Sequence, residues 1–149
     1  MSLMDRLSAD MKDAMKAREA GKLRLSVLRM AKSAIKYVEI DKHKELSDEE
    51  IIEVLAREVK MRRDAIEEYA RANRPDTVAQ LNEEISILMD YLPQQLSEEE
   101  VKQLVSEAVS ATGAQGPKEM GKVMGWLMPK VKGKADGKLV NQLVKAALE

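Results

Sequence analysis

The sequence contains no cysteine and no phenylalanine, and only one tryptophan and one histidine. Without cysteine, disulfide frameworks and thiolate metal sites are excluded, and the composition fits a reducing compartment. No apolar run approaches the ~20 residues that a membrane-spanning helix needs. The opening stretch MSLMDRLSADMKDAM carries charges every few positions, unlike the apolar centre of a signal peptide. We therefore expect a cytoplasmic protein without a membrane segment.

Groups suited to catalysis or metal binding are equally scarce. The single histidine, His43, lies in the polar segment 41–45, where a solvated loop residue is the simplest interpretation. A di-metal carboxylate centre would require paired Glu-x-x-His motifs, which one histidine cannot supply. Neither a glycine-rich phosphate loop after a strand nor a Ser/His/Asp nucleophile pattern is present. The sequence therefore predicts no catalytic residue, no metal and no cofactor, and the chain alone is not expected to be an enzyme.

The residues that are abundant favour helix, and we expect an all-α fold. Glycine, proline and capping residues divide the chain into about seven helices. Ser47 with Glu50, and Ser97 with Glu100, have the spacing of capping boxes, and Asp136 is a candidate N-cap. The predicted helices cover approximately residues 3–18, 23–41, 48–73, 75–92, 97–112, 117–128 and 136–148.

A polar link at residues 93–95 is the best candidate for a domain boundary. It would separate an N-terminal helical, bundle-like domain at residues 1–93 from a three-helix C-terminal domain at residues 96–149. Charge is also divided unevenly: residues 1–112 contain 18 basic and 23 acidic side chains, whereas residues 113–149 contain seven lysines and three acidic residues. A basic module joined to an acidic one indicates a localised anionic partner.

The helix predicted at 117–128 has two distinct faces at 100° per residue. Methionine and aliphatic residues share one face: Met120, Val123, Met124, Leu127 and Met128. The other face carries Lys118, Gly121, Lys122 and Gly125. Because glycine within a helix costs about 1 kcal/mol relative to alanine, two of them beside lysines suggest a backbone that must be approached closely. Lys130, Lys132, Lys134 and Lys138 continue the positive charge, and Trp126 at the edge could stack on a base or a ribose.

Two interpretations of this face follow from the residues. In the first, it contacts a phosphate backbone through charge and steric openness. In the second, Gly121-x-x-x-Gly125 admits a partner helix, and the protein is an interaction adaptor that binds no RNA. A further basic cluster at Arg57, Lys60, Arg62 and Arg63 is interleaved with acids, which favours a solvated face with i, i+4 pairs. Glu83 and Glu84 are likewise expected to be solvated.

Several motifs together resemble those of the YqeY-like (GatB/YqeY) family. They are Glu58-Val-Lys-Met-Arg-Arg-Asp64, Tyr91-Leu-Pro-Gln-Gln-Leu96, Met120-Gly-Lys-Val-Met-Gly125, Lys130-Val-Lys-Gly-Lys-Ala-Asp-Gly137 and Val140-Asn-Gln-Leu-Val144. The resemblance implies an N-terminal helical domain and a three-helix domain shared with the tail of the GatB subunit of aspartyl/glutamyl-tRNA amidotransferase. In that enzyme the tail helps to bind the tRNA body, while transamidation occurs elsewhere.

The resemblance also implies a function and a set of site residues. It implies an accessory role with tRNA or a tRNA-handling enzyme as partner, although the family label is carbon–nitrogen ligase activity with glutamine as amide donor. The catalytic body of the amidotransferase is absent, so the chain alone should not amidate a substrate. The nucleic-acid-binding residues that the resemblance implies are Lys118, Gly121, Lys122, Gly125, Lys130, Lys132, Gly133, Lys134 and Lys138.

Overall fold

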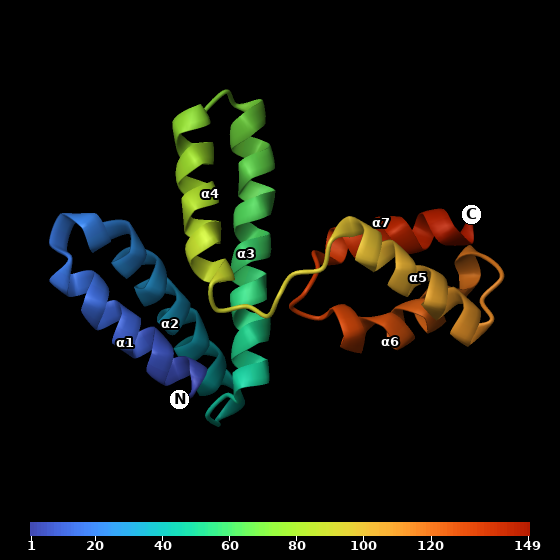
Figure 1. Cartoon of the computed structure of the whole chain (residues 1–149), viewed down its shortest axis with the longest axis horizontal. Helices are drawn as coiled ribbons and strands as arrows, with labels where there is room; N and C mark the ends of the chain where they lie inside the picture. The colour runs from blue at the N-terminus through green and yellow to red at the C-terminus, as the bar shows by residue number, and fades with distance from the viewer. The chain divides into compact units, whose positions relative to one another are not determined.

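The computed structural model describes residues 1–149 and contains seven α-helices and no strand (Figure 1), so the predicted all-α class is confirmed. The chain divides into two compact units, Met1–Leu92 and Pro93–Glu149. That these units are separate domains, as expected for residues 1–93 and 96–149, stays a prediction. None of the helices has both the length and the apolar character needed to cross a membrane.

The first unit consists of two helical hairpins. Its helices are α1 (Leu3–Lys16), α2 (Lys22–Lys42), α3 (Asp48–Arg71) and α4 (Pro75–Met89). A short 3-10 turn, Arg18–Gly21, joins α1 to α2. A Cβ added at Gly21 would lie 2.2 Å from the Ala14 carbonyl oxygen, so only glycine allows the chain to return this close to α1.

The core of the first unit occupies only one half of the α3–α4 hairpin. Its fully buried side chains include Leu7, Leu28, Ile35, Ile51, Leu55 and Leu88. In Figure 1, α1 and α2 lie against the half of this hairpin that holds the start of α3, and the other half projects beyond them. The buried side of α3 therefore ends before the end of the helix, and Tyr69 is 39% exposed. Within the first unit, helices pack on one half of the hairpin only, because no third helix of this unit covers the other half.

The second unit contains three helices: α5 (Glu98–Thr112), α6 (Met120–Val131) and α7 (Gly137–Leu148). A 3-10 turn, Pro117–Glu119, leads into α6. Helix α5 packs against both α6 and α7. Each helix contributes buried residues at helical spacing to one core: Val101, Val105, Ala108, Val123, Leu127, Val131, Val140, Val144 and Leu148.

Side-chain caps are present at the starts of the three helices for which the sequence predicted them. The Ser47 Oγ accepts from the Glu50 N–H, and the Glu50 carboxylate accepts from the Ser47 N–H at 3.2 Å, which completes the predicted capping box. The Ser97 Oγ accepts from the Glu100 N–H at 3.2 Å. The Asp136 carboxylate accepts from the Lys138 N–H at 3.2 Å. These contacts confirm Ser47, Ser97 and Asp136 as N-caps.

Candidate nucleic-acid interface

Helix α6 places its two glycines on the outside of the second unit. Val123, Leu127 and Val131 point into the core, whereas Gly121 and Gly125 are exposed. A Cβ added at either glycine would meet no atom within 4 Å. No helix of the second unit therefore packs on the glycine stripe, and within this unit its backbone is open.

The opposite face of α6 departs from the expected pattern at its end. Met120 and Met124 are half-buried and pack against the core of this unit. Met128, which we expected on the buried face, is 39% exposed. Val131 occupies the corresponding inward position one turn closer to the C-terminus, so the core is completed without Met128.

Pro129 lies inside α6 and does not end it, contrary to the expected end near residue 128. Proline lacks an N–H and cannot donate to the carbonyl of Gly125, one turn earlier. The helix nevertheless continues to Val131, whose side chain is buried, and the Lys132 N–H donates to the Met128 carbonyl at 2.9 Å. Core packing at Val131 therefore keeps the last turn helical.

After α6 the chain makes a tight turn over residues 131–134. Lys132 has φ −59° and ψ 122°, Gly133 has φ +74°, and the Lys134 N–H donates to the Val131 carbonyl at 2.8 Å. These values define a type II β-turn, in which the third residue adopts a positive φ that glycine tolerates without strain. Gly133 is thus required by the turn that carries Lys132 and Lys134, which we call the basic turn (residues 131–134).

The six predicted lysines, Lys118, Lys122, Lys130, Lys132, Lys134 and Lys138, are all exposed. They differ in their partners. Lys122 lies 3.4 Å from a carboxylate oxygen of Glu119. The Lys130 ammonium lies 4.6 Å from the centre of the Trp126 ring. Lys118 and Lys134 form no ion pair in the structure. The six lysines therefore lie in one region, on α6 and the turns that flank it. They do not form one continuous charged surface.

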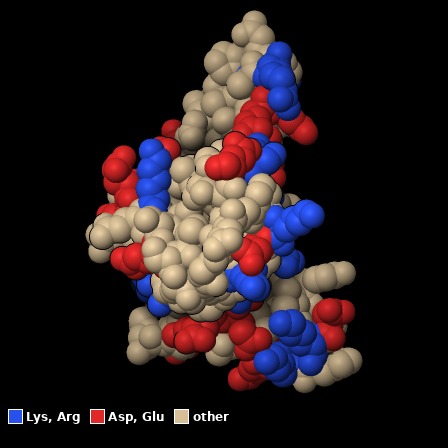
Figure 2. Space-filling model, turned by 90° about the vertical axis from the view of Figure 1, so that its right-hand side faces the viewer, with Lys and Arg blue, Asp and Glu red and all other residues tan.

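Glu119 is an acidic residue within this basic set. Its carboxylate accepts hydrogen bonds from the Gln115 backbone N–H and from Lys122. These two bonds, in that order of effect, lower the pKa of Glu119 below its ordinary value of 4.5. Glu119 is therefore ionised at neutral pH and offsets part of the Lys122 charge. On the face that Figure 2 presents, basic and acidic groups are interspersed among uncharged atoms, with no continuous basic area.

Residues of the link at 93–96 also belong to this region, which the sequence did not indicate. The Gln95 side-chain amide donates to the Gly133 carbonyl at 2.8 Å, and the Leu96 N–H donates to the Lys134 carbonyl at 2.8 Å. Gln95 was expected in a polar link and in the family motif Tyr91–Leu96, with no role in the candidate site. Nearly forty residues separate the partners, so no local pattern could have predicted the contact.

The other basic cluster, around Arg62, lies in the first unit. Arg62 itself is buried and contributes to the fold. The Arg62 side chain is only 8% exposed; its guanidinium lies 3.0 Å from Glu84 and 3.7 Å from Glu58. The expectation that Arg62 and Glu84 are solvated is therefore wrong. Because α3 and α4 pack as an antiparallel pair, Glu84 lies beside Arg62. No buried side-chain polar atom of the chain lacks a hydrogen-bond partner.

The single histidine and the acidic residues do not form a metal-binding cluster. His43 is exposed and ends α2 in a left-handed conformation, with φ 56°. No group of three or more His, Asp or Glu side chains is placed to hold a metal ion. The exposed lysines and glycines of the second unit remain the candidate site.

Comparison with known proteins identifies the family to which this chain belongs. The model of the family described as Yqey-like protein matches residues 4–148. A glutamyl-tRNA(Gln) amidotransferase subunit of Thermococcus sibiricus is 36% identical over an alignment of 120 residues, and the match covers 71% of this chain and 18% of the relative. Its counterpart in Thermococcus gammatolerans is 35% identical over an alignment of 113 residues, and that match covers 70% of this chain and 17% of the relative. This chain thus spans less than a fifth of either relative.

The match to a second kind of relative covers most of both chains. Altered inheritance of mitochondria protein 41, mitochondrial, of Pyrenophora tritici-repentis is 27% identical over an alignment of 135 residues, and the match covers 89% of this chain and 73% of the relative. The family match includes all seven helices, from α1 to α7. The chain therefore belongs to the Yqey-like protein family.

Proposed function

We propose that the chain is an RNA-binding accessory protein whose second unit contacts tRNA through α6 and the basic turn. The observation that carries the proposal is the exposed glycine stripe of α6, where an added Cβ would meet no other side chain or helix within 4 Å and which is flanked by lysines. A phosphate backbone can approach such a surface closely, and ammonium groups then release its counterions. The names of the amidotransferase relatives support tRNA as the nucleic acid.

Trp126 provides a second contact for the same ligand. Its half-buried ring is covered by Lys130 at 4.6 Å. An exposed cation–π contact stabilises by about 0.5–1 kcal/mol, whereas stacking of a base on an aromatic ring contributes about 1–3 kcal/mol. An unstacked base of the RNA can therefore replace the ammonium group, which becomes free to bind a phosphate.

The proposal is tested by titrating the full chain with tRNA at low salt. Trp126 is the sole tryptophan, so its fluorescence reports on the site directly. We expect an emission change and a dissociation constant that rises steeply with salt concentration. The double variant Lys122→Glu, Lys134→Glu should bind at least about tenfold more weakly and with a smaller salt dependence.

A matched control separates local contacts from net charge. The double variant Lys12→Glu, Lys145→Glu has the same change in charge but alters exposed lysines outside the candidate site. It should bind tRNA nearly as well as the wild type. Equal losses in the two double variants, or no binding by the wild type at low salt, would contradict the proposal.

The open glycine stripe also supports a second candidate function. An exposed Gly-x-x-x-Gly surface with Met128 exposed beside it suits close packing of a partner helix. The chain would then be an adaptor for a tRNA-handling enzyme and would not bind RNA itself. A stoichiometric protein partner that survives nuclease treatment and is lost with Gly125→Leu would favour this function.

Neither function gives the chain catalytic residues of its own. The amidotransferase activity in the relatives' names belongs to proteins of which this chain spans less than a fifth. The cytoplasmic location stays a prediction, because the Pyrenophora relative is named as a mitochondrial protein.

A further inference from the structure

The segment that enters the second unit is bonded to the basic turn. The Gln95 amide nitrogen donates to the Pro93 carbonyl and to the Gly133 carbonyl, both at 2.8 Å. The next residue, Leu96, donates its backbone N–H to the Lys134 carbonyl at 2.8 Å. Two consecutive carbonyls of the basic turn are therefore held from outside the turn.

These bonds add to the hydrogen bonds that close the turn. Within the turn, the Lys134 N–H and the Ala135 N–H both donate to the Val131 carbonyl, at 2.8 and 3.1 Å. The Gly133 carbonyl and the Lys134 N–H belong to one peptide unit, next to the flexible backbone of Gly133. The turn holds this peptide plane from its N–H side, and the Gln95 bond holds it from its carbonyl side. The direction in which the Lys134 side chain leaves the backbone depends on that plane.

We propose that Gln95 is a positioning residue for the candidate nucleic-acid surface. Its amide holds the basic turn in the conformation that presents Lys132 and Lys134, so that these ammonium groups need not be ordered when a phosphate binds. This inference rests on the proposed function, because it assigns to Gln95 a role in the same site. Gln95 itself touches no ligand in this role.

The neighbouring hollow does not offer a simpler explanation. It is lined by Pro93, Gln94, Gln95, Leu96, Glu100 and Lys134. The Glu100 carboxylate would repel an anion there, so the hollow is not a phosphate site in its own right. The contribution of Gln95 thus comes from the hydrogen bond that it donates to the turn.

The test uses the full chain with three variants. Gln95→Ala removes the side chain, Gln95→Met keeps its length but cannot donate, and Gln94→Ala changes the exposed neighbour as a control. Backbone 15N relaxation at residues 132–135 measures the order of the turn without RNA. Titration with tRNA through Trp126 fluorescence, at a temperature where all variants are folded, measures binding.

We expect both Gln95 variants to loosen the turn and to bind tRNA about three- to tenfold more weakly, because ordering the lysines then opposes binding. Their salt dependence should equal that of the wild type, since the number of phosphate contacts is unchanged. A loss of packing alone would affect Gln95→Ala but spare Gln95→Met. Gln94→Ala should behave as the wild type in both measurements.

The outcomes separate the two proposals. If the wild type binds tRNA and Gln95→Met binds equally well, the positioning role is wrong and the proposed function stands. If the wild type does not bind tRNA at low salt, the proposed function is wrong and the positioning role falls with it. A turn that is equally ordered in Gln95→Met also contradicts the positioning role, whatever the affinity.

Discussion

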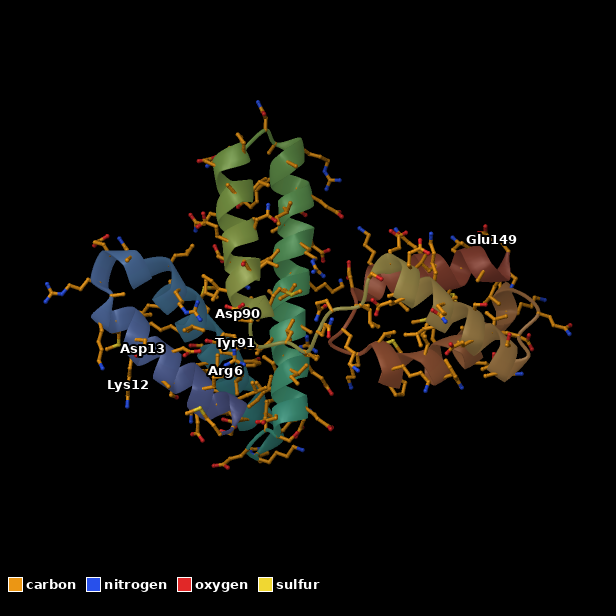
Figure 3. The ribbon with its side chains drawn as sticks, viewed as in Figure 1. Arg6, Lys12, Asp13, Asp90, Tyr91 and Glu149 are labelled. Atoms are coloured by element: carbon orange, nitrogen blue, oxygen red, sulfur yellow. The ribbon has the colours of Figure 1, made fainter.

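The hydroxyl of Tyr91 donates a hydrogen bond to the carboxylate of Asp10, which joins the end of the first unit to its first helix. The Arg6 guanidinium lies 4.6 Å from the Tyr91 ring centre and donates to the Asp90 carbonyl at 2.8 Å. Arg6, Asp90 and Tyr91 lie together in Figure 3 where α1 meets the end of α4. The residues that follow α4 are thus held against α1 by a buried aromatic ring and two polar contacts.

Replacing Tyr91 with phenylalanine should destabilise the first unit by about 1–2 kcal/mol, because a hydrogen bond to a charged group is lost and Asp10 loses a partner. Urea unfolding of the full chain measures the change. Tyr37→Phe is the control, since Tyr37 is 75% exposed and should alter stability little. Equal stability of Tyr91→Phe and the wild type would contradict this prediction.

Alkaline pH should weaken the same contact. Burial, and secondly the hydrogen bond to Asp10, raise the pKa of Tyr91 from 10.0 to about 12. A group whose pKa is raised on folding contributes stability that is complete below its unfolded pKa and is lost as the pH rises through its folded pKa. The advantage of the wild type over Tyr91→Phe should therefore shrink between pH 10 and 12. A constant difference in urea midpoints over this range would disprove the assignment.

Acid should weaken the start of α3. The hydrogen bond from the Ser47 backbone, followed by that from Lys44, lowers the pKa of Glu50 from 4.5 to about 2. A pKa lowered on folding contributes stability that is complete above pH 4.5 and is lost as the pH falls towards 2. Glu50→Gln can still cap the helix but lacks the charge, so the wild type's advantage should fade over this range. Urea midpoints of both proteins from pH 2.5 to 7 provide the measurement.

The buried Arg62 network should respond differently to single and paired changes. Glu84→Ala leaves Arg62, 8% exposed, without its 3.0 Å partner, and we expect a loss of about 2–3 kcal/mol. The double variant Arg62→Met, Glu84→Leu removes both charges and should lose less than Glu84→Ala. Asp64→Ala breaks the exposed pair with Lys60 and should cost less than about 1 kcal/mol. A double variant less stable than Glu84→Ala would contradict this account.

Filling the glycine stripe should make the protein more stable and a weaker binder. Alanine at Gly121 or Gly125 meets no atom within 4 Å and should stabilise α6 by about 0.5–1 kcal/mol. Gly21→Ala is the opposite case, because its Cβ would collide with the Ala14 carbonyl. Thermal unfolding and tRNA titration of the same variants measure both effects. A destabilised Gly125→Ala would show that the stripe is not open.

Features governed by neighbouring residues could be predicted from the sequence. Ser47, Ser97 and Asp136 were identified as caps because a cap depends on residues two or three positions away. The outward placement of Gly121 and Gly125 followed from helical periodicity in the same way. These parts of the fold and of the candidate site required no knowledge of tertiary contacts.

The features that were missed depend on residues distant in the chain. Arg62 was taken for a surface residue because only the pairing of α3 with α4 brings Glu84 to it. Pro129 was expected to end its helix, but packing of Val131 in the core outweighs the missing hydrogen bond. The bond from Gln95 to Gly133 likewise joins segments that only the folded unit brings together.

The projecting half of the α3–α4 hairpin has a practical consequence. Residues 67–76, which include its connection, are exposed, and none of them belongs to the core. Lengthening such a connection costs little, since closure entropy grows only slowly with the number of residues. A fluorophore-binding tag or an affinity peptide inserted after Asn73 should leave both cores intact. The protein could then be immobilised for interaction measurements with its terminal helices α1 and α7 unaltered.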